Sequence, residues 1–460
     1  MTLERTLGLF PATNIVIANM IGAGIFTTSG LLMADLRDPL LMILLWIAGG
    51  VIALCGALSY GILGAAIPEA GGEYAFLSRL YHPSLGFLSG WVSFVVGFSA
   101  PIAASALGFS EYFSRAFPAW LAPLEAAGLR NPATAKQLLA IAVIAAFTLV
   151  HLRGIRPGAR VQNSLTFLKV VLILGLLCLG FFWGRGDFGH FAEREASALD
   201  FSRWKTIGLS LMWIMFAYSG WNASTYIGAE IRNPSRNVPL SLLLGTLVVL
   251  FLYLSLNILF VYALRPDEMA GVLSVGGLAA GQLFGRSMET VVSLLISFAL
   301  FSSLSAFIML GPRVYYAMAR DGYFFRSIAG IHPRSGVPAR AILFQSAISV
   351  VMVLSGTFDQ ILTYMGFSLG IFPILAALGV FRLRPAGRTG RLRVGYPAAA
   401  LLYAISGFCI LTLAFFERPA ESSIALGTVV AGVPLYIVFK NRYHDQKDVR
   451  SSEQPAGTPQ

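Results

Sequence analysis

Two short stretches place glycines and polar residues inside long apolar runs, and the backbone groups that they free could bind a small charged molecule. The stretches are IGAGIF at residues 21–26 and FAYSGWNAST at residues 216–225. Glycine destabilises a helix by about 1 kcal/mol relative to alanine, so we expect the helical backbone to unwind at both places. In lipid, unwound backbone is tolerated where it lines a cavity or is buried by protein. Matching breaks in two halves of a chain are a sequence sign of a central binding site.

The groups freed at the two breaks have opposite polarity. The first break frees the amides of Gly22, Ala23, Gly24 and Ile25. They start a half-helix, whose dipole favours an anion such as a carboxylate. The carbonyls that could accept hydrogen bonds from an ammonium lie near Ile21, Phe216, Ala217 and Ser219, with Gly220 in the same turn. Together these poles fit an α-amino acid, whereas one Gly-x-Gly motif alone would indicate close helix packing.

Lys169 is an ionisable residue inside the apolar run VQNSLTFLKVVLILGLLCLGFFW at residues 161–183. An isolated cation in lipid costs roughly 2.5–3.5 kcal/mol or more. If the helix starts near Val161, Lys169 lies about 12 Å along it, farther than its side chain comfortably reaches. We expect its ammonium to bind carbonyls at the first break and hydroxyls among Ser302, Ser303 and Ser305, in place of a sodium ion. A structural or snorkelling lysine is the alternative.

The elements that must hold these residues are membrane helices. Hydrophobic residues make up 56% of the 460 residues, charged residues make up 12%, and the mean hydropathy is +0.73. A spanning helix needs about 20 mainly apolar residues, and the sequence provides about twelve such windows. They lie near residues 8–32, 40–67, 84–114, 137–152, 161–183, 205–229, 238–263, 287–318, 339–355, 358–381, 394–416 and 422–439. The predicted fold class is therefore an all-α polytopic membrane protein.

The distribution of basic residues predicts the orientation. With the N-terminus inside and the loops counted alternately, roughly two thirds of the 33 lysines and arginines fall on the cytoplasmic side. The positive-inside rule thus predicts a multi-pass protein of the cell's inner (cytoplasmic) membrane with both termini cytoplasmic. The net charge of +11 needs no nucleic-acid partner, because the basic residues are spread among loops that face anionic lipid.

Other classes of protein need residues that the sequence does not supply. A membrane-embedded enzyme is the alternative from another class, but no metal-spaced histidine cluster or nucleophile elbow is present. A channel would need a filter-like repeat or a ring of charges. Cys55, Cys178 and Cys409 fall inside predicted spans, so neither a disulfide framework nor a metal cluster is indicated. We expect no cofactor and no bound metal.

Six motifs in order along the chain resemble those of the amino acid–polyamine–organocation superfamily, and within it the bacterial relatives of the L-type amino acid transporters. They are GAGIF at 22–26, IPEAGGEY at 67–74, VQNSLTFLK at 161–169, FAYSGWN at 216–222, EIRNPSRNVP at 230–239 and GPRVYYAMARDG at 311–322. The resemblance implies a LeuT-like fold of two inverted five-helix repeats with helices 1 and 6 broken, plus two extra helices. It also implies alternating access.

The resemblance divides the chain and assigns roles at the breaks. It implies one transmembrane domain over residues 1–440, with repeats at about 8–183 and 205–381, helices 11 and 12 at about 394–439, and a disordered cytoplasmic tail at 441–460. The amides of the first break would hold the substrate carboxylate. Carbonyls near Phe216, Ala217 and Ser219 would hold the amino group, and Phe216 would act as a lid.

Departures from the family pattern narrow the expectation. Ala23 stands where the family often has serine, so a hydroxyl is lost there while the backbone amides remain. Ser219 stands where many L-type members have glycine, and its side chain is expected to narrow the pocket and to favour small neutral amino acids over large aromatic ones. A carrier of cationic amino acids or polyamines is the alternative, but it would need an acidic residue in the pocket, and we expect none beside either break.

The loop near 115–136 lacks a cysteine, so we expect no disulfide-linked heavy subunit. Lys169 predicts sodium independence, while exchange and proton coupling both stay open.

Two further features have more than one interpretation. PEAGGEY and RNPSRN are typical of turns and helix ends in cytoplasmic loops. Alternatively, Glu69, Glu73, Glu230 or Arg320 could form ion pairs of an inner gate. Glu111, near the outer end of the third span, is expected to be a solvated end residue, with a proton-carrying role as the alternative.

Overall fold

The protein is described by a computed structural model that covers residues 3–22, 24–121, 131–193, 200–272, 275–285, 287–355, 358–383 and 395–452. Helices form nearly all of the regular structure within these residues. Two isolated β-bridges, Leu7 with Ile231 and Ala70 with Ile227, join loop segments near the helix ends.

The predicted membrane helices are present. Nine helical stretches within the described residues are long and apolar enough to cross a membrane. They are α1–α2 (Leu9–Met20 and Gly24–Leu36), α3 (Pro39–Ala66), α5–α6 (Pro83–Val92 and Ala100–Ala116), α8 (Pro132–Leu152), α9 (Ile155–Trp183), α12 (Pro234–Ala263), α15 (Ser287–Arg320), α18 (Ala398–Glu417) and α19 (Pro419–Ser452). The other three predicted spans correspond to α10 (Phe201–Ala217), α16 (Ala339–Ser355) and α17 (Phe358–Leu378).

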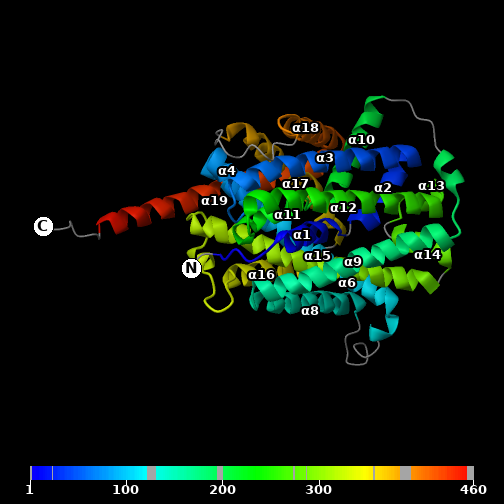
Figure 1. Ribbon diagram of the computed structural model, residues 1–460, viewed down its shortest axis with the longest axis horizontal. Coiled ribbons are helices and arrows are strands. Elements are labelled where there is room, and N and C mark those ends of the chain that lie inside the picture. The colour runs from blue at the N-terminus through cyan, green and yellow to red at the C-terminus, as the bar shows by residue number, and fades with distance from the viewer. Residues whose placement is uncertain are drawn as a thin grey trace.

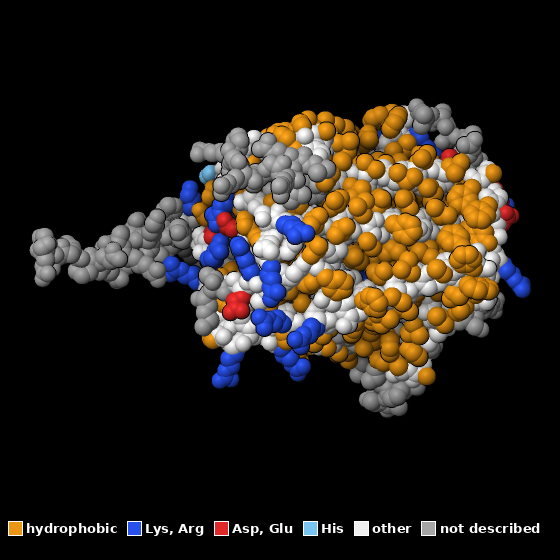
Figure 2. Space-filling view, in the orientation of Figure 1, with side chains coloured by type: hydrophobic (Ala, Val, Ile, Leu, Met, Phe, Trp, Pro, Cys, Tyr) orange, Lys and Arg blue, Asp and Glu red, His pale blue; other side chains and the backbone are white. Residues whose placement is uncertain are grey.

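The long helices run roughly side by side, and the two ends of the bundle differ (Figure 1). Both termini lie at one end, together with α4 (Glu73–Leu80). The short helices α13 (Pro266–Met269) and α14 (Val275–Phe284) lie at the opposite end. Figure 2 shows lysine and arginine side chains gathered at the end that carries the termini, while hydrophobic side chains cover the broad middle. We call this end the basic end.

The helices differ in how much of their surface the protein buries. The most apolar window of α1–α2 is 88% buried, against 28% for α9 and 22% for α19. Large apolar side chains stand on the outer surface of α9, where Phe167 is 65% exposed and Phe182 is 77% exposed. Apolar surface on this scale requires an apolar solvent, so the outer face of the bundle is the face toward lipid. The broken first helix lies inside.

Two predicted boundaries and one predicted continuous span differ from the structure. The fifth span begins at Ile155 and not near Val161, which puts Lys169 about 21 Å from its start and well beyond snorkelling reach. The third span is interrupted by a wide π-helical stretch at Ser93–Ser99. The last helix continues to Ser452, past the predicted start of the disordered tail at 441, because a formed helix extends at little cost into residues that follow it.

Candidate functional site

The first predicted break is present between α1 and α2. Helix α1 ends at Met20, and α2 begins at Gly24. Ala23 lies outside the described residues. The break turns one membrane helix into two half-helices, so that a negative C-terminal end and a positive N-terminal end both lie inside the protein.

The second predicted break follows Ala217, where α10 ends. The chain then turns through Gly220, whose φ of +96° is a conformation that residues with a Cβ atom rarely adopt. Within this turn the amide of Ser219 donates to the carbonyl of Phe216 at 2.9 Å. A short helix, α11 (Ala223–Tyr226), continues beyond it. Glycine at 220 is therefore a backbone requirement of the break.

The two breaks pack directly against each other. A Cβ atom added to Gly24 would lie 2.7 Å from the Cα of Ala217, and one added to Gly220 would overlap Asn19. Tyr253 of α12 joins the two breaks, because its hydroxyl lies 2.6 Å from the carbonyl oxygen of Met20 and 3.0 Å from that of Ala217. Sequence reasoning missed Tyr253, since a tyrosine in an apolar run resembles any other packed aromatic residue.

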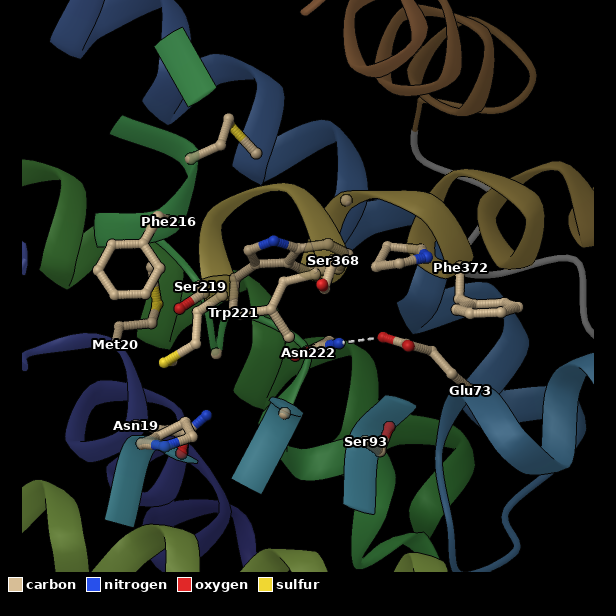
Figure 3. A pocket seen from close by; sticks show the side chains of 18 of the residues that line it. Asn19, Met20, Glu73, Ser93, Phe216, Ser219, Trp221, Asn222, Ser368 and Phe372 are labelled. Atoms are coloured by element: carbon tan, nitrogen blue, oxygen red, sulfur yellow. Dashed lines mark hydrogen bonds between the residues drawn. The ribbon is translucent and has the colours of Figure 1, made fainter. Parts of the chain in front are cut away.

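A cavity of about 160 Å³ lies beside the joined breaks (Figure 3). This volume is below the roughly 300–1,000 Å³ of sites for drug-sized ligands, so the cavity suits a smaller molecule. The residues from the breaks that line it include Asn19, Met20, Gly22, Gly24, Phe216, Ala217, Ser219, Gly220, Trp221 and Asn222. Ile21 and Ile25 are fully buried and are not among the described lining residues. Most of the predicted substrate-binding residues thus border one space.

Lys169 lies behind the first break. Its ammonium donates to the carbonyl of Ile21 at 2.8 Å, to that of Ala18 at 3.4 Å, and to the hydroxyl of Ser303 at 3.0 Å. All three acceptors are uncharged, and the side chain is 1% exposed. The C-terminal end of α1 supplies the partial negative charge that a buried cation needs. The carbonyl of Ile21, which the sequence predicts as an acceptor for the substrate ammonium, is thus occupied by Lys169.

The three serines predicted around Lys169 have different partners. Ser303 bonds Lys169, and its hydroxyl also donates to the Ile21 carbonyl at 2.6 Å. Ser305 instead contacts the Nε2 atom of His151 at 3.0 Å. The carbonyl of Ser302 accepts a hydrogen bond from Gln162 at 3.3 Å. On a helix, neighbouring residues point in different directions, so the SSLS motif delivers one hydroxyl to Lys169.

Glu73 is a cavity residue that sequence reasoning missed. It begins α4 and is 5% exposed, yet it lines the cavity opposite Phe216 (Figure 3). Asn222 of the second break donates to its Oε1 atom at 2.5 Å, and the hydroxyl of Tyr226 donates to the same atom at 3.2 Å. Burial raises the pKa of this carboxyl to about 7. The expectation that no acidic side chain lies beside either break is therefore wrong.

The segment before Glu73 explains its position. Gly71 and Gly72 both have positive φ, at +106° and +53°, so the chain turns sharply before α4 begins. The amide of Gly71 donates to the carbonyl of Tyr226 at 3.1 Å, which fixes this turn to the segment after the second break. The PEAGGEY motif is a turn, as expected, and it also places the carboxyl of Glu73 in the cavity wall.

Ion pairs gather at the basic end. Glu69 contacts Arg79 at 3.0 Å and Arg320 at 3.3 Å, and these side chains are one third to nearly one half exposed. Glu230 pairs with Arg313 at 2.8 Å, and both side chains are 1% exposed. The backbone carbonyl of Glu230 also accepts hydrogen bonds from the amides of Thr6 and Leu7. These pairs join the N-terminal segment, α4, α15 and the loop after α11, whereas Glu73 forms no ion pair among the described residues.

The sequence of this chain is similar to known transporters over nearly its whole length. Residues 7–439 match the family model described as amino acid permease. The chain is 27% identical to the b(0,+)-type amino acid transporter 1 of Mus musculus, covering 95% of this chain and 88% of that protein. It is 27% identical to the large neutral amino acids transporter small subunit 2 of Rattus norvegicus, covering 97% and 82%. It is also 27% identical to the serine/threonine exchanger SteT of Bacillus subtilis, covering 96% and 98%.

Proposed function

This chain belongs to the amino acid permease family and is a multi-pass membrane transporter of amino acids, and from that premise we propose that it carries small neutral L-amino acids without sodium. We propose exchange or uptake across the cytoplasmic membrane by alternating access. The observation that supports this most is the direct contact of two helix breaks beside one cavity. The same two breaks offer an anion site and a cation site to one small molecule.

The substrate carboxylate binds at the N-terminal end of α2. The amides of Gly24 and Ile25 lie in the first turn of α2, where they have no helical acceptor, and we assign the amides of Gly22 and Ala23, which precede them in the sequence, to the same anion site. Gly22 and Gly24 border the cavity, where a carboxylate can approach the backbone closely. The dipole of α2 adds attraction for negative charge. An N-acetylated amino acid keeps this interaction, whereas an ester loses it.

The substrate ammonium binds at the C-terminal end of α10. The carbonyls of Phe216 and Ala217 each have one donor, Ser219 and Tyr253 respectively. A carbonyl oxygen has two lone pairs, so each can accept a second hydrogen bond. Phe216 borders the cavity next to Met20 (Figure 3). From this position its ring covers the substrate. Ser219 and Gly220 complete the turn, and the Ser219 side chain limits the size of the substrate.

Lys169 replaces a coupling cation. Its ammonium bridges α9, the end of α1 and Ser303 of α15, in the manner of a metal ion that holds helices together. Its charge is fixed in place by three uncharged acceptors, so no sodium ion is needed at this position. Ser302 and Ser305 support the packing around it through Gln162 and His151.

Transport proceeds by relative movement of two inverted repeats within one membrane domain, at about 8–183 and 205–381, with helices 11 and 12 outside them. The ion pairs of Glu69 and Glu230 close the basic end as an inner gate. We place this end in the cytoplasm, because basic residues gather there with both termini. The membrane is the cell's inner membrane, and no disulfide-linked heavy subunit is needed.

Glu73 favours a second candidate substrate class. A buried carboxyl in the cavity wall can pair with a cationic side chain, so cationic amino acids or polyamines are the alternative substrates. Small neutral amino acids remain the main proposal, because Glu73 already accepts two hydrogen bonds on Oε1.

The test is uptake by purified protein in liposomes with sodium-free buffer. Radiolabelled amino acids are offered to vesicles with and without internal amino acid. We expect uptake of L-serine and L-alanine that internal substrate stimulates, and no competition by serine methyl ester or N-acetylserine. Uptake of lysine or a polyamine in place of these would contradict the neutral class, and uptake that requires sodium would contradict the role of Lys169.

A further inference from the structure

We propose that Glu73 is a proton-binding residue of the transport site, so that an amino acid and a proton on this carboxyl enter the closed cavity together. The inference rests on the proposed function and adds the coupling ion to it. Four features of the structure support it: the position of Glu73, its neutral partners, the engagement of nearby charges elsewhere, and its contrast with Lys169.

The position of Glu73 gives it access to the transported molecule. Its carboxyl lies in the cavity wall that also contains Phe216, Ser219 and Gly22, the proposed substrate contacts. The rest of the side chain is enclosed, with 5% of the residue exposed. Water that enters the open cavity can therefore deliver a proton to this carboxyl, and bulk solvent at the basic end cannot reach it directly.

The groups that face Glu73 are neutral. Asn222 and Tyr226 donate hydrogen bonds to Oε1, and two further tyrosines are close enough to interact electrostatically, Tyr60 on α3 and Tyr403 on α18. These groups stabilise a carboxylate in part but do not neutralise it. A proton is the remaining way to remove the charge when no cationic ligand is present.

The charged groups of neighbouring elements are engaged elsewhere. On α4 itself, Arg79 pairs with Glu69 and with Asp321. On α15, Arg313 pairs with Glu230, and Arg320 pairs with Glu69. On the segment after α17, Arg382 lies over the ring of Tyr81. No lysine or arginine of the described residues forms an ion pair with Glu73, so its charge has no fixed counter-ion there.

Closure of the cavity couples the proton to the substrate. In the open cavity, water solvates the Glu73 carboxylate. When an amino acid fills the cavity and the breaks close over it, that water leaves, and the charged form loses its solvation. The loaded, closed state therefore favours protonated Glu73. By reciprocity, protonation of Glu73 increases the affinity for the amino acid, and the substrate increases the affinity for the proton.

The physical chemistry of the carboxyl agrees with this cycle. Burial raises the pKa of Glu73 to about 7, so that the group gains and loses a proton near neutral pH. Lys169, by contrast, is not among the described residues that line the cavity, and its hydrogen atoms are held by Ile21, Ala18 and Ser303. Of the two buried charges, Glu73 is the one that cavity water can reach.

The experiment uses sodium-free proteoliposomes with the wild type, Glu73→Gln, Glu73→Asp and Glu111→Gln. Glu111 is the matched control, because it is a carboxylate of the outer part of α6 that pairs with Lys136 at 2.7 Å, away from the cavity. Two measurements are made with L-serine: counterflow against internal serine over a range of external pH, and net uptake into serine-free vesicles driven by an inward proton gradient, with a pH-sensitive dye inside.

We expect the wild type and Glu111→Gln to accumulate serine under the proton gradient while the vesicle interior acidifies. Glu73→Gln should lose this gradient-driven uptake, and its counterflow should no longer depend on external pH. In the wild type, the apparent affinity for serine should fall by at most about tenfold per pH unit above the carboxyl's pKa, as one proton requires. Glu73→Asp should restore gradient-driven uptake with a shifted pH profile.

Gradient-driven uptake that persists in Glu73→Gln would overturn the proposal, and so would wild-type counterflow that a proton gradient does not convert into net uptake. Neither result would affect the assignment as a neutral amino acid carrier. If Glu73→Gln also loses counterflow, the Glu73→Asp variant tests the proposal instead. A pH profile of serine counterflow by Glu73→Asp that is identical to that of the wild type would contradict a proton site at residue 73. Uptake of L-lysine that requires Glu73, together with serine uptake indifferent to pH, would identify a site for cations and contradict the proposal.

Discussion

Lys169 and Glu73 are both ionisable side chains buried beside a helix break, and neither forms an ion pair among the described residues. Their surroundings differ in one respect. Lys169 donates to three uncharged acceptors, two of them at the C-terminal end of α1, and the cavity does not border it. Glu73 accepts from two neutral side chains and borders the cavity.

The difference shows how a membrane protein can hold a charge in two ways. A charge whose hydrogen bonds are all made to fixed backbone carbonyls and a buried hydroxyl behaves as part of the framework, because moving it would leave several polar groups without a partner at once. A charge that faces a cavity changes its environment whenever the cavity fills or empties, so its proton affinity follows the transport cycle. We therefore expect substitutions at Lys169 to abolish transport at every pH, and substitutions around Glu73 to change its pH dependence.

The largest effect is expected for Lys169→Met, which keeps an unbranched side chain as far as the ε position and removes the ammonium. The Ala18 and Ile21 carbonyls lose their charged donor, and the link between α9 and α1 is broken. A charge-assisted hydrogen bond contributes about 1.5–3 kcal/mol, so the loss of two or three should reduce transport by roughly a hundredfold or more. Serine counterflow per mole of reconstituted protein measures this. Lys136→Met, which removes a lysine on α8 with 29% of its side chain exposed, is the control.

Normal counterflow by Lys169→Met would show that the ammonium is not needed, and the contrast with Glu73 would then fail. Counterflow by Lys169→Met that falls below the wild type at one pH and equals it at another would also contradict the framework role, because the ammonium would then be needed at one pH alone.

Tyr253→Phe tests the connection between the two breaks. The substitution removes the hydroxyl that lies against the Met20 and Ala217 carbonyls and keeps the ring, which packs 5.1 Å from Tyr218 and 5.6 Å from Trp46. One buried hydrogen bond contributes about 1 kcal/mol, and the carbonyls left unpaired add to the loss. We expect a fall of about tenfold in serine affinity at every pH, measured by equilibrium binding. An unchanged affinity would exclude Tyr253 as the connection.

Glu73→Gln should change stability in a way that depends on pH. The pKa of this carboxyl is about 7 in the folded protein, above its ordinary value of 4.5, so the folded state holds the proton more tightly than the unfolded state. The stability that this group contributes is present below about 4.5 and is lost as the pH rises through 7. Glutamine does not titrate. In detergent, the melting temperature of Glu73→Gln should therefore exceed that of the wild type above pH 7. This difference in melting temperature should shrink as the pH falls.

If the difference in melting temperature stayed constant between pH 4.5 and pH 7, Glu73 would not titrate between its ordinary pKa and the pKa of about 7 in the folded protein. A difference that grows toward acid pH would mean that the folded protein stabilises the carboxylate, contrary to the role argued for it.

Tyr226→Phe is expected to have the smallest effect. The hydroxyl of Tyr226 donates to the Glu73 carboxyl at 3.2 Å, and this hydrogen bond lowers the pKa of Glu73 against the larger effect of burial. Its removal should raise the pKa, so the midpoint of the pH profile of serine counterflow should move upward by less than about one unit. A downward shift would mean that Tyr226 stabilises the protonated form.

The fold and half of this comparison could be predicted from the sequence. Apolar windows of membrane length identify helices without any knowledge of their neighbours, and glycines in such windows identify the breaks. Lys169 is isolated in an apolar run, so its need for backbone partners at the first break follows from the cost of an unpaired cation. The contacts with Ile21 and Ser303 agree with that expectation. The partner of Ser305, His151, could not be inferred, because it depends on the rotation of α15 against α8.

The other half could not be predicted, because the local sequence around Glu73 is that of a surface turn. Its burial follows from where the turn packs, and the bond between the Gly71 amide and the Tyr226 carbonyl joins segments far apart in the chain. The role of Tyr253 could not be predicted from the sequence for a related reason. Its hydroxyl has a function only once α12 lies against both breaks.

The most direct test of the central claim is a structure of the protein in lipid nanodiscs with saturating L-serine and no sodium. We predict the serine carboxylate within hydrogen-bond distance of the Gly22 and Gly24 amides, its amino group at the carbonyls of Phe216 or Ala217, and Lys169 still bonded to Ile21. Serine bound elsewhere in the cavity, or bound with its amino group on the amides of the first break, would contradict the account.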